Sequence, residues 1–88
     1  MCMRAREWFF RQLDEYARRR YRCFVAEMFP SENHTEYIIC LRPVGVTLAS
    51  SDQYACCYVG IAVADVDAAH GEERLTDSTT EKLVHTLE

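Results

Sequence analysis

Two segments of the chain have the composition of β-strands, in which successive side chains point to opposite faces, yet both faces of each segment are apolar. Residues 54–66 place cysteine, valine and isoleucine on one face and tyrosine, cysteine and alanine on the other. Residues 36–42 repeat the pattern, with tyrosine, isoleucine and leucine opposed to isoleucine and cysteine. A sheet with one solvated face should be polar on that face, so we expect both faces of this sheet to be covered.

An amphipathic helix is predicted before these strands, over Met3–Arg20. Phe9, Leu13 and Ala17 recur at the three-and-four spacing of one helix face, which can cover one face of the sheet. At the other end, residues 78–81 have the spacing of a capping box and precede a short run of apolar residues, which predicts a weak C-terminal helix.

The remaining elements are predicted from alternation and from turn residues. Residues 21–28 fit either a continued helix or a strand, and we favour a strand because a polar connection at residues 30–34 would join it to 36–42 as a hairpin. Residues 46–53 indicate a short strand and a loop, and 54–66 a long strand with a bulge or bend at Gly60.

These elements predict an α+β fold of the order α-β-β-β-α. A long N-terminal amphipathic helix packs on a three-stranded antiparallel sheet, a short C-terminal helix follows, and residues 1–88 form a single domain. A chain of 88 residues buries a small core. The second sheet face is covered either by the C-terminal helix together with the 44–52 loop or by another protein, and we expect a homodimer.

Charge divides the chain into a basic start and an acidic remainder. Residues 1–22 hold seven arginines against three acids, a net charge of +4, whereas residues 23–88 hold three bases against eleven acids, a net charge of −8. Arg18, Arg19, Arg20 and Arg22 are candidate phosphate ligands, so nucleic-acid binding is the alternative function. A solvated helix end, whose arginines complement the helix dipole, is the favoured interpretation because the whole domain is acidic.

Cysteine usage predicts free thiols rather than disulfides. The five cysteines are odd in number and four lie in apolar or aromatic runs, so we expect small core residues and a cytoplasmic, reducing location. Adjacent strand residues point to opposite faces, so Cys56 and Cys57 cannot both ligate one ion, and we predict no metal site and no cofactor. No apolar run is long enough to cross a membrane.

The absence of a catalytic motif and the two-sided strands lead to a functional hypothesis. We expect a non-enzymatic protein-binding regulator or inhibitor that acts by steric occlusion of a protein target of unknown identity. In being small, acidic and poor in motifs it is similar to the inhibitors that phages direct against host systems. The acidic segment from Asp65 to Asp77 would set the orientation in which the target binds, although a solvated loop is the simpler interpretation of this segment. The predicted partner-binding residues are Trp8, Phe10, Tyr54, Tyr58, Asp65, Asp67, Glu72 and Glu73.

Overall fold

The computed structural model describes residues 3–45 and 56–88. Helix α1 spans Ala5–Tyr21, which confirms the predicted N-terminal helix, and the apolar spacing buries Phe9, Leu13 and Ala17 on one face. The helix ends at Arg22, whose left-handed backbone conformation (φ 56°) turns the chain toward the sheet.

The sheet has three antiparallel strands in the order β1-β2-β3. Strand β1 spans Cys23–Pro30, β2 spans Glu36–Pro43 and β3 spans Cys57–Ala62. Residues 21–28 are therefore mostly strand, which confirms the favoured alternative. The left-handed turn at Arg22 ends the helix before its apolar spacing can continue into these residues. A register shift between Val25 and Glu27 places a bulge in β1.

The predicted strand over 54–66 is wrong at its C-terminal end. β3 ends at Ala62, and Val63–Glu72 forms helix α3. The small and branched apolar residues after Ala62 fit the two-residue period of a strand as well as the 3.6-residue period of a helix. Val66 and Ala69 lie three residues apart and are both buried, so the helix places both in the core. Residues 46–53 and Tyr54 lie outside the described residues.

The short C-terminal helix is confirmed as α4, Asp77–Leu87, but its cap is not the predicted one. The side chain of Thr76 caps the helix by accepting a hydrogen bond from Thr79 N at 3.2 Å. The helix thus begins two residues before the helix implied by the capping-box spacing of Ser78 and Glu81. Thr76 has the same favourable cap chemistry two residues earlier in a row of polar residues.

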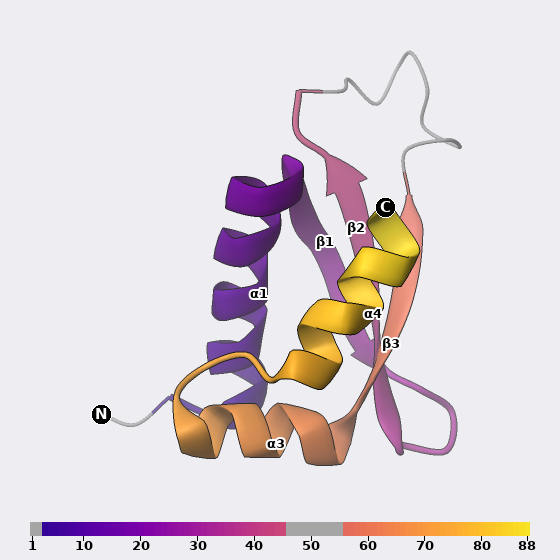
Figure 1. Ribbon diagram of the computed structural model, residues 1–88. Coiled ribbons are helices and arrows are strands. Elements are labelled where there is room, and N and C mark those ends of the chain that lie inside the picture. The colour runs from indigo at the N-terminus through magenta and orange to yellow at the C-terminus, as the bar shows by residue number, and fades with distance from the viewer. Residues whose placement is uncertain (1–2, 46–55) are drawn as a thin grey trace.

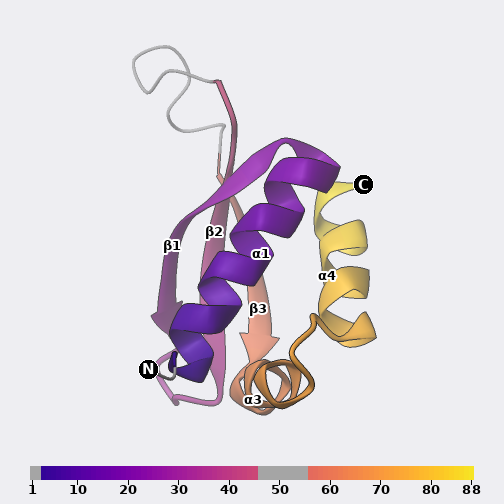
Figure 2. The same ribbon diagram turned by 90° about the vertical axis from the view of Figure 1, so that its left-hand side faces the viewer.

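All three helices contribute to one core on one side of the sheet (Figures 1 and 2). Helix α1 packs on β1, α4 packs beside β3, and α3 closes the end of the core between them. The largest fully buried side chains come from both layers and include Phe9, Leu13, Ile39, Ile61 and Leu83. The molecule is therefore a helical layer against a sheet whose opposite side carries no described helix.

Candidate protein-docking surface

The outer face of the sheet is the face that points away from the three helices. Strand register defines it, because directly paired residues share a face and successive residues alternate. Ile39 and Leu41 of β2 point into the core, so Ile38 and Cys40 between them point outward. By the same register the outer face comprises Phe24, Glu27, Phe29, Glu36, Ile38, Cys40, Arg42, Tyr58, Gly60 and Ala62.

This outer face is apolar at its centre and exposed at its sides. Ile38 is half-buried and Cys40 is buried on the central strand, while Phe29 on β1 is 41% exposed and Tyr58 on β3 is 61% exposed. Of the two expected covers, the one formed by the C-terminal helix together with the 44–52 loop is wrong for the helix, because α4 packs on the same side as α1 (Figure 1). Residues 46–52 of that loop lie outside the described residues. Within residues 3–45 and 56–88, no helix or strand lies against this face.

The edges of the sheet, in contrast, are occupied by side chains. On β1, Asp14 Oδ1 accepts a hydrogen bond from Val25 N at 2.8 Å and Arg6 Nη2 donates to Met28 O at 2.9 Å. The bulge in β1 and the lack of an N–H at Pro30 also disfavour pairing with another strand. These contacts leave the outer face, rather than this edge, as the surface available to a partner.

The opposite edge strand, β3, also has a side-chain contact. Lys82 Nζ of helix α4 donates a hydrogen bond to Gly60 O at 3.2 Å. A lysine at an edge strand opposes the addition of a further strand, because its charge would lose water. Side chains therefore disfavour the addition of a further strand at both edges of the sheet, whereas no described helix or strand covers the outer face.

Charge along the outer face follows the central strand. β2 begins with Glu36 and reaches Arg42 near its end, and the two outward side chains between them are apolar. Neither forms an ion pair within the described part of the chain, and Arg42 Nε is buried without a hydrogen-bond partner there. The central strand thus carries one acid and one base at opposite ends of an apolar patch.

The two aromatic residues predicted from the N-terminal helix lie away from the outer face. Trp8 is half-buried against the core, and its ring lies 5.6 Å from that of His70 on α3. Phe10 is also half-buried and lines a shallow pocket of about 320 Å³ together with Arg6, Glu7, Arg11 and Met28. Of the predicted aromatic contacts in the described residues, only Tyr58 is on the outer face.

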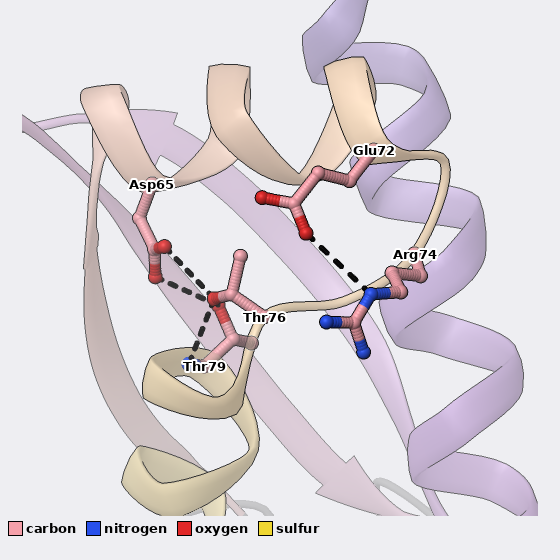
Figure 3. A network of polar contacts seen from close by, with 5 residues as sticks. All are labelled: Asp65, Glu72, Arg74, Thr76 and Thr79. Carbon is pink, nitrogen blue, oxygen red and sulfur yellow. Dashed lines mark hydrogen bonds and ion pairs between the residues drawn. The ribbon is translucent and has the colours of Figure 1, made fainter.

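The predicted acidic residues serve two different purposes. Asp65 is structural: its Oδ1 accepts from the Thr76 hydroxyl at 2.8 Å and its Oδ2 from the buried Thr79 hydroxyl at 3.0 Å, which joins α3 to α4 (Figure 3). Asp67 and Glu73 are exposed, and Glu72 is exposed within 3.5 Å of Arg74. The three exposed acids lie on α3 and just beyond it, at the end of the core.

The arginine cluster does not form one continuous basic face. Arg18 Nε pairs with Asp14 Oδ2 at 2.9 Å, and its guanidinium lies 5.4 Å from the ring of Phe24. Arg20 lies 3.5 Å from Glu88, while Arg19 faces the chain between α3 and α4. The cluster is therefore distributed around the helix end, with two of its members next to acids.

The prediction of free cysteines is wrong for Cys40 and Cys56, which form a disulfide. The register explains the pairing: the direct partner of Cys40 is Tyr58, and Cys56 lies two residues earlier on the same face, with the two Cα atoms 6.1 Å apart. The cysteine pattern consequently gives no support for a reducing compartment. Cys57, on the opposite face from Cys56, is free and exposed.

Cys23 is the other free cysteine of the described residues, and it is half-buried beside the core. Its Sγ donates to Tyr21 O at 3.5 Å. Burial raises the pKa of the Cys23 thiol, and the neighbouring Cys57 raises it further. Burial also raises the pKa of Tyr21, whose hydroxyl donates to Glu88 at 2.8 Å. Neither group has the lowered pKa of an activated nucleophile.

Within residues 3–45 and 56–88, no three histidine, cysteine or acidic side chains come together in a way that could hold a metal ion. No helix of these ranges is long and apolar enough to cross a membrane. Comparison with protein-family models, with curated proteins and with solved structures gave no match. The outer face is accordingly the basis for a functional proposal.

Sequence reasoning missed Phe29 as a candidate, although its signal was present. Phe29 alternates with Met28 at the end of β1, so one of the two had to point away from the core. The charged ends of β2 were also missed, because only the apolar side chains of residues 36–42 entered the prediction. Their shared face became visible only with the strand register.

Proposed function

We propose that the protein is a non-enzymatic, protein-binding regulator or inhibitor that acts by steric occlusion, with the outer face as its docking surface. The observation that carries this proposal is the exposure of Phe29 (41%) and Tyr58 (61%) on a sheet face that no described helix covers. Exposed aromatic side chains around an apolar centre are typical anchors of protein interfaces. The protected sheet edges support face-to-face docking over strand addition.

The acidic and basic groups have secondary roles in this proposal. Asp67, Glu72 and Glu73 are exposed and set the direction of approach and the association rate, whereas Asp65 is committed to the Thr76 and Thr79 hydroxyls. The arginines beside Asp14 and Glu88 complement the protein's own acids, which supports protein binding over nucleic-acid binding. Trp8 and Phe10 pack against the core, so the proposal does not count them with Phe29 and Tyr58 as residues that anchor a target.

The proposal is tested by capture of a target with matched surface variants. The wild-type chain, a Phe29→Ser/Tyr58→Ser variant and a Val84→Ser control are each immobilised at low density and exposed to extract of the cells in which the protein acts. Val84 is a suitable control because it is 41% exposed on α4, away from the outer face. We expect the wild type and the control to retain the same protein and the double variant to lose it. Equal retention by all three chains would contradict the proposal.

A further inference from the structure

The outer face of β2 is complementary to itself, and we propose that a second copy of this chain covers it while no target is bound. This inference rests on the proposed function, because it names the occupant of the same docking surface. Face-to-face packing of two sheets is a common way to bury such a surface. A two-fold axis lying between the two sheets would relate the copies, so that the same patch serves both.

Charge decides how the two copies are oriented. Glu36 and Arg42 lie three residues before and three residues after Ile39, and both point outward. An axis that crosses β2 at Ile39 and runs the two β2 strands antiparallel places Glu36 opposite Arg42 of the partner subunit. Running the strands parallel would instead oppose like charges, which is unfavourable.

The side chains have the reach that this arrangement requires. Three residues of strand span about 10 Å, and the twist between packed sheets displaces their ends sideways by several ångströms. Glutamate and arginine are long enough to bridge such a displacement at the periphery of the patch.

The same axis places the exposed tyrosine opposite a glycine on β3 of the second copy. Ile39 pairs with Val59, so Tyr58 and Gly60 lie symmetrically on either side of the axis. Tyr58 is then placed opposite Gly60 of the partner subunit, the one outer-face position without a side chain. In each copy the Glu36 carboxylate lies over Gly60 of the same chain, because a Cβ added at Gly60 would lie 2.8 Å from Glu36 Oε1. This carboxylate can accept a hydrogen bond from the hydroxyl of Tyr58 of the other copy.

The arrangement on β1 is compatible with the same axis. Ile39 pairs with Met28, so Glu27 and Phe29 lie symmetrically about it, and Glu27 faces Phe29 of the partner subunit. Glu27 is exposed on an edge strand, so its carboxylate can stay in solvent at the periphery of the interface. The aromatic ring then contacts the methylene groups of the glutamate.

The test measures the solution mass of the full chain by sedimentation equilibrium over a dilution series. All variants carry Cys57→Ser, which removes the exposed thiol of the described residues and the disulfide-linked dimers that it could form. We expect Glu36→Arg alone and Arg42→Glu alone each to weaken the dimer about tenfold or more at low salt, because each opposes like charges across the axis. The combined Glu36→Arg/Arg42→Glu chain should recover most of the loss, since it exchanges the two charges.

Two further variants locate the interface. Tyr58→Asp should give a monomer, and Val84→Asp, on α4, should leave the dimer unchanged. Urea unfolding of every variant confirms that the chains fold. The proposed orientation and occupant are overturned if the Tyr58→Asp chain still forms the dimer. They are also overturned if the combined charge-exchange variant does not recover dimer formation. A Cys57→Ser chain that stays monomeric without any further substitution also overturns this inference. It leaves the target-capture experiment free to succeed, so the two failures are distinguishable.

Discussion

Both faces of the sheet carry apolar side chains, but the two faces have different environments. The inner face packs its apolar side chains under α1, α3 and α4, and Ile39 and Ile61 are fully buried there. The outer face presents phenylalanine, isoleucine and tyrosine with no described helix against them. The comparison teaches that apolar strand residues alone do not show which face forms the core; the placement of the helices does.

The sharpest test of this comparison uses neighbouring isoleucines on β2. Ile39→Ala should lower the free energy of unfolding by about 2–5 kcal/mol, because it opens a cavity beneath the helices. Ile38→Ala, which changes the same residue type on the outer face, should cost about 1 kcal/mol or less because Ile38 is only half-buried. Urea unfolding at low protein concentration measures both without a contribution from self-association.

Equal losses for the two isoleucine variants would contradict the described difference between the faces. They would mean that something covers the outer face as completely as the helices cover the inner one.

The junction between α3 and α4 holds the helical layer over the inner face and should be the next most sensitive region. Asp65→Ala leaves the buried Thr79 hydroxyl without its acceptor, so we expect a loss of about 1–3 kcal/mol in the free energy of unfolding. Asp67→Ala is the matched control, since Asp67 is exposed on the same helix, and should change stability by about 0.5 kcal/mol or less. Similar values for both would remove the structural role assigned to Asp65.

Thiol reactivity compares two positions at one end of the inner face, where Cys23 and Cys57 both lie. At neutral pH, iodoacetamide should alkylate Cys57 several times faster than Cys23, because Cys57 is exposed whereas burial raises the pKa of Cys23 and lowers its thiolate fraction. Peptide mass spectrometry over a time course follows each cysteine separately. Faster alkylation of Cys23 than of Cys57 would contradict the described difference in burial between these two thiols.

The smallest effect is expected at the arginine cluster. Replacing Arg18, Arg19 and Arg20 by alanine removes two solvent-exposed ion pairs and should change stability by less than about 1 kcal/mol. Fluorescence anisotropy with short DNA and RNA should detect no binding at low salt by either chain. Affinity that falls steeply with salt and disappears in the variant would instead support the nucleic-acid alternative.

Local pattern predicted much of the fold because it specifies local structure. The three-and-four spacing of Phe9, Leu13 and Ala17 identified α1, and the two-residue alternation of 36–42 identified β2. Pattern failed after Ala62, where the alternating and helical periods overlap and burial of Val66 and Ala69 selects the helix. Of the predicted anchors, Tyr58 lies on the outer face, while Trp8 is packed against His70.

The sequence by itself determined the types of α1, β2 and α4, the charge division and the fact that β2 and β3 are apolar on two sides. These properties depend on neighbours along the chain, so spacing and composition are sufficient to predict them. Only the tertiary structure decided that all three helices share one face, that Cys40 meets Cys56, and that Glu36 and Arg42 flank one apolar patch. Those relations join residues distant in the chain, and they follow from strand register and from the burial of a single core.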